Sequence, residues 1–402
     1  MARYTVVTMP GDGIGNQVIP EALRVLMAVG FDADYVHADV GWELWRNEGN
    51  ALPSRTIDLL AKHKLGLFGA ITSKPKKEAE AELDPKLRDK GYVYYSPIVT
   101  MRQHFNLDIC MRPCVGFPGN PLNYIRKKPE GGFVEPQINT TIFRQNTEGM
   151  YCGIEWTNPP DIVRAALDSH PKFKAFADVP GRDLAASVRI ITRPAAERII
   201  TAAFEFAKRK GFKAVTICEK PNVVRETSGM MEEVAKEIQK KFPDIQLWRN
   251  NIDAQLMWLS KNPEDFNVIV ASNLFGDILS DAFAGLIGGL GFAASGNIGS
   301  EVAVFEPTHG SAPKYAGLNP PIVNPIAAIL AAAMLLEHVG EYDKAKRIWD
   351  AVAAVVKEGK VRTYDMMRLT GGPDVLKQGA ASTPQMTDAI LAKLSEYREG
   401  VE

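Results

Sequence analysis

Apolar and polar positions along the chain alternate between two periods, one typical of buried strands and the other of amphipathic helices. Residues 4–11, YTVVTMPG, form an apolar run with several β-branched side chains, which predicts a strand. A helix is predicted next, because apolar residues then recur with helical spacing at Val18, Ile19, Ala22, Leu23 and Leu26. Such strands and helices in alternation predict an α/β sheet with helices on its faces.

The same two patterns return along most of the chain. Further strands are expected within 33–41, 64–72, 106–116, 140–156, 213–220, the first part of 245–262, and 266–273. Further helices are expected within 54–63, 194–211, 228–242 and the second part of 245–262. We find no internal repeat and no linker, so a second domain would be an insertion into the first.

Three segments depart from this alternation. Residues 326–340, IAAILAAAMLLEHVG, are too few to cross a bilayer and end in charged and polar residues, so they predict a buried helix. Residues 76–95 are strongly charged and predict a solvated loop or helix near a cleft. Residues 120–139 are rich in Pro, Gly and Asn and predict a surface excursion.

Composition narrows the class of protein. The 402 residues carry a formal net charge of −1, and no basic stripe interleaved with aromatic residues is present. Neither nucleic acid nor a membrane surface is therefore an expected partner. The four cysteines form no CxxC pair and the N-terminal residues do not resemble a signal peptide, so we expect reduced thiols and a cytoplasmic location.

The glycine-rich stretch GDGIG, residues 11–15, raises the question of a dinucleotide-binding loop. A Rossmann fingerprint needs G-x-G-x-x-G, but Asn16 stands where the third glycine belongs. Asp32 and Asp34 match only loosely the acidic residue expected about 20 positions further on. The spacing favours a tight strand-to-helix turn in which Asp12 accepts hydrogen bonds from backbone amides, although it does not exclude the Rossmann loop.

Two later segments carry the candidate chemistry. Asp277 and Asp281 lie four positions apart in a predicted helix and therefore share one face of it. Their apolar neighbours argue against a fully solvated face, so a hard divalent cation such as Mg²⁺ or Mn²⁺ is the favoured compensation, and a solvated or capping role is the alternative. Residues 305–317, FEPTHGSAPKYAG, combine small residues with cationic and aromatic ones. They suit an adenine ring with a phosphate beside it, although an ordinary loop is equally compatible with the bare pattern.

Taken together, the motifs resemble those of the β-decarboxylating dehydrogenases, the family of isocitrate, isopropylmalate, homoisocitrate and tartrate dehydrogenases. The matching motifs occur in the family's order over nearly the whole chain: GDGIG, MRQ with LDICMRP, FRQNTEGMYCGIEW, EKPNVV, NLFGDILSD, GNIG and FEPTHGSAPKYAG. The resemblance implies an α/β isopropylmalate dehydrogenase-like fold, which is not a Rossmann fold. It also implies a large cofactor-binding domain (1–107 and 287–402) and a small domain for substrate binding and dimerisation (108–286), with a clasp near 149–192.

The resemblance further implies a site shared between two subunits of a homodimer. The implied substrate-binding residues are Ser96, Ile98, Arg102, Arg112 and Arg144, the arginines being suited to bidentate binding of carboxylates. The implied catalytic residues are Tyr151, Lys220 and Asp253, and the implied ligands of Mg²⁺ or Mn²⁺ are Asp253, Asp277 and Asp281. In the family, the equivalents of Lys220 and Asp253 come from the neighbouring subunit.

The cofactor implied by the resemblance is NADP. The lysine and tyrosine that hold the 2′-phosphate in NADP-using members correspond to Lys314 and Tyr315, and a later pair corresponds to Tyr364 and Arg368. NAD-using members have an acidic residue at the lysine position, which would repel that phosphate. The full set of implied cofactor-binding residues is Asn297, Glu306, His309, Gly310, Ser311, Ala312, Lys314, Tyr315, Val323, Asn324, Tyr364 and Arg368.

The expected reaction is the oxidative decarboxylation of isocitrate to 2-oxoglutarate. Isocitrate enzymes usually have an asparagine at the position of Ile98, and an apolar side chain there cannot bond the third carboxylate of isocitrate. Homoisocitrate, an isopropylmalate-like acid or another analogue is therefore the alternative substrate. A regulatory subunit that binds ligand without turnover is the alternative class.

Overall fold

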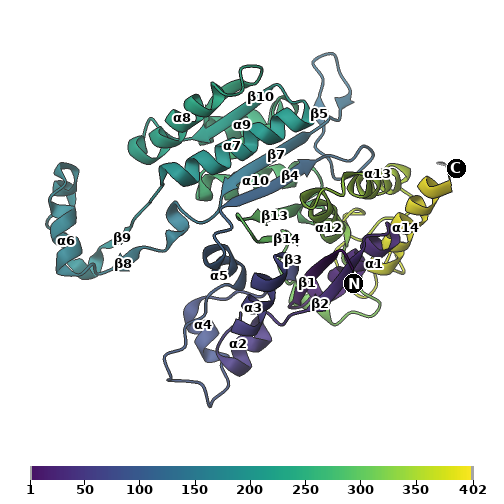
Figure 1. Ribbon diagram of the computed structural model, residues 1–402, viewed down its shortest axis with the longest axis horizontal. Coiled ribbons are helices and arrows are strands. Elements are labelled where there is room, and N and C mark those ends of the chain that lie inside the picture. The colour runs from purple at the N-terminus through teal and green to yellow at the C-terminus, as the bar shows by residue number, and fades with distance from the viewer. Residues whose placement is uncertain (1, 400–402) are drawn as a thin grey trace.

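The computed structural model describes residues 2–399 and contains one ten-stranded sheet with helices on both faces (Figure 1). Across the sheet the strands follow the order β11-β10-β12-β7-β4-β13-β14-β3-β1-β2. The pairs β7–β4, β4–β13 and β13–β14 in the middle are antiparallel, and all other pairs are parallel. The sheet confirms the predicted α/β class, and its mixed centre differs from the all-parallel sheet of a dinucleotide-binding domain.

The strands of this sheet are short and mostly buried. Their bounds are β1 Tyr4–Gly11, β2 Ala33–His37, β3 Leu65–Ala70, β4 Ile109–Val115, β7 Asn139–Gln145, β10 Ala214–Glu219, β11 Gln246–Asn251, β12 Val268–Ala271, β13 Ala294–Ile298 and β14 Ala303–Pro307. Two small ladders lie outside it, β5 Arg126–Lys127 with β6 Phe133–Val134, and β8 Glu155–Thr157 with β9 Ala185–Ser187.

Helices connect the strands and cover the sheet. Their bounds are α1 Gly15–Ala28, α2 Trp42–Glu48, α3 Ser54–His63, α4 Lys76–Ala81, α5 Pro97–His104, α6 Asp161–Asp168, α7 Arg193–Lys210, α8 Arg225–Gln239, α9 Ile252–Leu259, α10 Asn273–Leu286, α11 Pro313–Ala316, α12 Ile326–His338, α13 Tyr342–Glu358 and α14 Thr383–Glu399.

The strand order separates the sheet into two contiguous halves. Strands from residues 109–271 form one half, and strands from residues 4–70 and 294–307 form the other. The halves meet where β4 pairs with β13. The predicted division into domains 1–107 with 287–402 and 108–286 runs along this junction, and it stays a prediction because the sheet is continuous across it.

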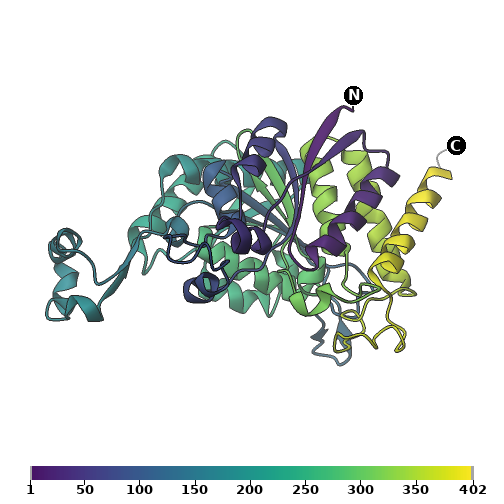
Figure 2. The ribbon, with the colours of Figure 1, turned by 90° about the horizontal axis from the view of Figure 1, so that it is seen from below.

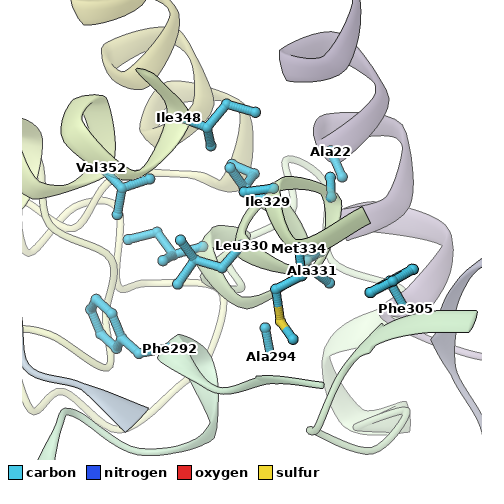
Figure 3. Close-up of a cluster of buried hydrophobic side chains, with 14 of the residues drawn as sticks. Ala22, Phe292, Ala294, Phe305, Ile329, Leu330, Ala331, Met334, Ile348 and Val352 are labelled. Carbon is cyan, nitrogen blue, oxygen red and sulfur yellow. The ribbon is translucent and has the colours of Figure 1, made fainter. Parts of the chain in front are cut away.

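The centre of the core is helix α12, which is buried on all sides (Figure 3). Leu330 and Met334 of this helix lie among Ala294 and Phe305 of the sheet and Val352 of α13. The prediction of a buried helix in 326–340 is therefore confirmed. Within residues 2–399, no helix combines the length and the apolar character needed to span a bilayer.

Residues 149–190 leave the body of the molecule as an arm (Figures 1 and 2). A bridge between Gly149 and Ile190 closes its base, the β8–β9 ladder forms its stem, and α6 lies at its far end. Apolar side chains on the arm are exposed to solvent, 80% of Ile162 and 50% of Phe176. An arm of this kind presents apolar surface that its own chain does not cover.

Most of the charged segment 76–95 is exposed, as its composition predicts, but two apolar residues within it are buried. Helix α4 occupies its start, where Ala79 and Leu83 are buried against Trp42 and Trp45 of α2. The segment 120–139 is a surface excursion as predicted, with the short β5–β6 ladder inside it. Arg126 of this excursion is paired with Glu264 at 2.7 Å.

Candidate active site

Two of the predicted substrate arginines stand on neighbouring strands at the centre of the sheet. Arg144 of β7 pairs in register with Cys110 of β4, so Arg112 of β4 lies two positions away on the same face. Arg144 also pairs with Ala271 at the end of β12, and α10 begins two residues later. Helix α10 packs so closely that a Cβ added to Gly276 would lie 2.7 Å from the Cβ of Arg144.

This arrangement brings both arginines to the paired aspartates of α10. Nη1 of Arg112 lies 3.3 Å from Oδ1 of Asp277 and 3.2 Å from Oδ1 of Asp281, and it donates a 2.7 Å hydrogen bond to Oγ of Ser280. Arg144 forms an ion pair with the same Asp277, although its side chain is only 2% exposed. Burial by itself would raise the pKa of Asp277, but the charges of Arg144 and Arg112 lower it below its ordinary value.

The third arginine belongs to a buried polar network in the other half of the sheet. Nη2 of Arg102, on α5, lies 3.1 Å from Oε1 of Glu306, and its Nε donates to Oδ1 of Asn297 at 2.9 Å. Asn297 donates in turn to Glu306 at 2.7 Å and accepts a bond from Asn146 at 2.9 Å. Asn297 is fully buried and its amide is hydrogen-bonded within the protein, and its predicted contact with a cofactor stays a prediction.

Tyr151 joins the arginine–aspartate cluster from the base of the arm. Its hydroxyl donates a 2.6 Å hydrogen bond to Oδ2 of Asp277, and the guanidinium of Arg144 lies 5.1 Å from its ring centroid. Burial, assisted by the bond to Asp277, raises the pKa of Tyr151. The phenol is therefore held in its protonated form beside the carboxylate.

A cavity of about 250 Å³ connects these groups. Its polar lining consists of Arg102, Arg112, Arg144, Tyr151, Asp277 and Glu306. The apolar lining includes Phe68, Ile71 and Ile98, and residues 307–310 complete the wall. Ile98 thus faces the cavity as predicted, while Ser96, which immediately precedes α5, is not among the lining residues.

The predicted metal ligands come together only in part. Asp277 and Asp281 converge on Arg112, and their carboxylate oxygens are donors suited to a hard divalent cation. Asp253 is elsewhere, bonded to Lys220 at 2.5 Å, and neither residue lines the cavity. In the described part of the chain, no group of three or more His, Cys, Asp or Glu residues is placed to hold a metal. The single chain thus fits two of the three predicted ligands.

The glycine motif of residues 11–15 packs directly against the predicted cofactor loop of residues 305–317. The backbone N–H of Ile14 donates to the carbonyl of Ser311 at 2.9 Å, and a Cβ on Gly13, where φ is +55°, would lie 2.2 Å from that oxygen. Asp12 accepts bonds from the backbone N–H groups of Trp42 and Thr72, each at 2.8 Å. The predicted tight turn with an amide-binding Asp12 is confirmed.

His309 offers an observation that fits a bound cofactor. It lines the cavity, and its Nδ1 lies 3.1 Å from the carbonyl of Gly310. Burial lowers the pKa of this imidazole, so the ring is neutral. Within the described residues its buried Nε2 has no hydrogen-bond partner, which is costly unless a ligand supplies one. Beside it, a Cβ on Gly310 would meet open space.

The predicted 2′-phosphate residues are mostly gathered. Nζ of Lys314 lies 4.6 Å from the ring centroid of Tyr315, whose ring is 5.5 Å from that of Tyr364. Arg368 is exposed, and its Nη2 is 3.4 Å from the carbonyl of Pro121. Other predicted cofactor residues are internal: Ser311 pairs with Thr72 at 2.7 Å, Asn324 donates to Asp365 at 3.1 Å, Val323 is buried, and Ala312 precedes α11 with φ of 38°.

Sequence reasoning missed several residues that complete the site. Ser280 and Asn273, both on α10, hold Arg112 and Arg144 at 2.7 and 2.8 Å, and Asn146 anchors Asn297. Ser280 lies three positions after Asp277, so the helical period could have identified it. The apolar wall of Phe68 and Ile71 carried no comparable signal, because buried strand residues look alike in a sequence.

The fold is a mixed α/β fold, and its central cavity brings three arginines next to paired carboxylates. The family model "Isocitrate/isopropylmalate dehydrogenase" matches residues 5–390, so the chain belongs to the isocitrate/isopropylmalate dehydrogenase family. Members of this family are oxidative decarboxylating dehydrogenases that typically use a divalent metal and a nicotinamide cofactor. The family resemblance predicted from the motifs is confirmed.

Individual relatives are similar in sequence to this chain over most of its length. Protein DlpA of Legionella pneumophila is 36% identical over 96% of this chain, which spans 58% of DlpA. The isocitrate/homoisocitrate dehydrogenase of Thermus thermophilus is 37% identical, with 97% of this chain and 98% of the relative covered. Among solved structures, isocitrate dehydrogenase from Methylococcus capsulatus is similar with a TM-score of 0.79 and 34% identity, over 97% of this chain and 99% of that one.

Proposed function

We propose that this protein catalyses the NADP-dependent oxidative decarboxylation of a hydroxy acid that carries a second carboxylate on the neighbouring carbon. Isocitrate, converted to 2-oxoglutarate, is the first candidate. The observation that carries this proposal is the convergence of Arg102, Arg112, Arg144, Tyr151 and Asp277 on one cavity. Membership of the family and the buried Nε2 of His309, which has no partner within the described residues, support the cofactor.

The charge pattern supports a polyanionic substrate bound together with a cation. Each cavity arginine already has a carboxylate partner: Arg102 has Glu306, and Arg112 and Arg144 share Asp277. Mg²⁺ or Mn²⁺ held by Asp277 and Asp281 would supply charge stabilisation to substrate oxygens, and NADP⁺ would accept the hydride. Carboxylates engaged in that way release guanidinium groups for the substrate, which binds bidentately to such planar donors.

Proton transfer is assigned to two groups. Tyr151, with its raised pKa, is suited to protonate the carbon left by loss of CO₂. The Lys220–Asp253 pair is suited to take the hydroxyl proton, with the carboxylate of Asp253 as its acceptor, but the pair stands outside the cavity of its own chain. We therefore place Lys220 and Asp253 in the site of a second copy, so that the protein acts as a homodimer. The exposed apolar surface of the arm supports such an assembly.

The apolar wall of the cavity bears on which acid is the substrate. Ile98, Ile71 and Phe68 cannot donate a hydrogen bond to a third carboxylate, so homoisocitrate or an isopropylmalate-like acid is the alternative. The Thermus relative is named for both isocitrate and homoisocitrate, which supports both acids as candidate substrates. The deciding experiment compares kcat/KM for isocitrate, homoisocitrate and isopropylmalate with NADP⁺ and with NAD⁺ at fixed metal.

A matched substitution sharpens this comparison. If isocitrate is not the natural substrate, Ile98→Asn should improve its kcat/KM about tenfold, because the new amide can bond the third carboxylate. If isocitrate is the natural substrate, its use should hold or fall. Absence of CO₂ release and NADPH formation with every acid would contradict the enzyme and favour a silent, ligand-binding subunit.

A further inference from the structure

A second cavity, of about 450 Å³, lies behind the candidate active site on the opposite face of the sheet. Met111, Pro113 and Val115 of β4 line it, whereas Arg112, between them, lines the active-site cavity. This follows from strand geometry, since successive side chains point to opposite faces. On β7, Thr141 faces the rear in the same way, and Arg144 faces the front. We call this space the rear cavity.

The rear cavity occupies the seam between the two halves of the molecule. On one side of it lie Phe206 and Lys210 of α7. On the other side lie Met334 and Glu337 of α12, together with Trp349 of α13. Nζ of Lys210 and Oε1 of Glu337 are 3.6 Å apart, an ion pair that crosses the seam. A smaller cavity of about 160 Å³ shares Met111, Phe206, Met334 and Glu337 with it, so the hollow continues along the seam.

The lining defines the chemistry of a ligand. The walls are mainly apolar and aromatic: Met111, Pro113, Val115, Phe206, Phe212, Met334 and Trp349. Charged lining residues balance, with Lys210 and Lys346 against Glu337 and Asp343, so neither an anion nor a cation is favoured. One hydrogen-bond donor in the lining lacks an acceptor within the described residues. The indole Nε1–H of Trp349 is buried and has no partner in the described part of the chain, which costs free energy unless an acceptor is supplied.

We propose that the rear cavity binds a small, uncharged, largely apolar molecule with a hydrogen-bond acceptor for Trp349, and that its binding weakens substrate binding at the front. The front cavity takes Arg112 and Arg144 from one half of the sheet and Arg102 and Glu306 from the other. A molecule lodged in the seam opposes adjustment of the halves around a substrate. The coupling rests on the proposed function, whereas the binding site does not.

Binding is tested with prodan, a neutral aromatic ketone whose fluorescence reports an apolar environment. Wild-type protein without substrate should bind it with a blue-shifted emission. Asn139→Trp, at the exposed start of β7, should abolish binding by filling the cavity mouth. Phe133→Trp, on the exposed β6 strand, adds an indole elsewhere and should leave binding unchanged. Equal binding to wild type and Asn139→Trp would place prodan elsewhere and overturn the site.

The acceptor contact is tested by Trp349→Phe, which keeps an aromatic ring but removes the donor. Prodan affinity should fall about threefold to tenfold, the value of one neutral hydrogen bond. N-phenylnaphthylamine, which has no carbonyl oxygen, should bind both proteins equally. A parallel loss of both probes would show that the ring and not its N–H matters, and would contradict the proposed acceptor.

Coupling is tested by the KM of the best acid substrate at saturating prodan. KM should rise about fivefold or more in wild type and stay constant in Asn139→Trp. An unchanged KM with prodan bound would overturn the coupling. If no acid is turned over, the proposed function fails, and prodan binding in the absence of substrate still decides whether the rear cavity is a binding site.

Discussion

The cavity cluster and the Lys220–Asp253 pair are both assigned to the same reaction, yet they are built in opposite ways. Arg144 in the cavity is 2% exposed and contacts Asp277, Asn273 and the ring of Tyr151. Asp253 is 67% exposed, and its contact with Lys220 is a single 2.5 Å bond. Buried charges must be paired within the chain, because water cannot stabilise them. Exposed charges are under no such constraint and remain available to another molecule.

This difference indicates which part of the candidate active site a single chain can form by itself. In the cavity cluster the charges are paired within one chain, and the removal of Asp277 leaves the buried guanidinium of Arg144 without a carboxylate. The Lys220–Asp253 pair is incomplete because no third carboxylate in the described residues joins it. Variants in the two regions should therefore separate stability from activity, and the predictions below run from the largest expected effect to the smallest.

Asp277→Asn should have the largest effect, on both activity and stability. It removes the carboxylate shared by Arg144 and Arg112 and leaves the buried guanidinium of Arg144 uncompensated. We expect kcat/KM to fall about a thousandfold and the free energy of unfolding to fall by about 3 kcal/mol. Steady-state kinetics and urea unfolding measure these changes. Asp253→Asn is the control, which should lose activity with a much smaller change in the free energy of unfolding at neutral pH; equal destabilisation by both variants would contradict the comparison.

Lys220→Met and Tyr151→Phe should each lose about a hundredfold to ten-thousandfold in kcat, because each removes a proton-transfer group. A shared site makes a stronger prediction for their mixture. After the subunits are exchanged, one site of each mixed dimer has both intact residues, and activity should recover to about a quarter of the wild-type value. Sedimentation equilibrium verifies that dimers are present. Dimers that exchange subunits but stay inactive would show that the two residues do not act across the interface.

Much of the fold followed from local patterns. The buried helix at 326–340 was predictable because its apolar run is too short for a bilayer and has no polar face. The segment 76–95 was harder, because Ala79 and Leu83 stand among charged residues and only the tertiary structure brings Trp42 and Trp45 to them. Pairing of strands as distant as β7 and β12 has no local signal at all.

The candidate active site is likewise divided into residues that the sequence predicts and residues that it does not. Asp277 and Asp281 could be paired from helical spacing, and the arginines could be assigned from motifs that resemble the family. The partners of Arg102 could not, since Asn297 and Glu306 come from strands 195 and 204 positions further along the chain. The role of Asn297 as a cofactor contact stays a prediction, and the use of its buried amide inside the protein could not be read from the sequence.

Lys314→Glu should have a moderate effect confined to the cofactor. The substitution places a negative charge next to Tyr315 and Tyr364, where the proposal locates the 2′-phosphate. The kcat/KM for NADP⁺ should fall about tenfold to a hundredfold, with that for NAD⁺ little changed. Lys127→Glu, on the exposed β5 strand, changes charge equally and should leave both values alone. A similar loss with both cofactors would contradict selection of the phosphate by Lys314.

The smallest effect is on the pH dependence of stability, and it separates the two regions by their response to salt. In the folded state the pKa values of Asp277 and Asp253 are both lowered from the ordinary 3.8. Burial raises the pKa of Asp277, but the nearby arginine charges lower it further than burial raises it. The pKa of Asp253 is lowered by the hydrogen bond from Lys220. The unfolded state then binds more protons, so each contribution is complete above the ordinary pKa and is lost as pH falls through the lowered one. Urea unfolding between about pH 5 and pH 2 should show a shallower loss in each Asn variant than in wild type. Salt at about 1 M should remove the difference for exposed Asp253 but leave most of it for Asp277, because buried pairs are screened far less. Equal screening of the two would show that the cavity cluster is as open to solvent as the Lys220–Asp253 pair.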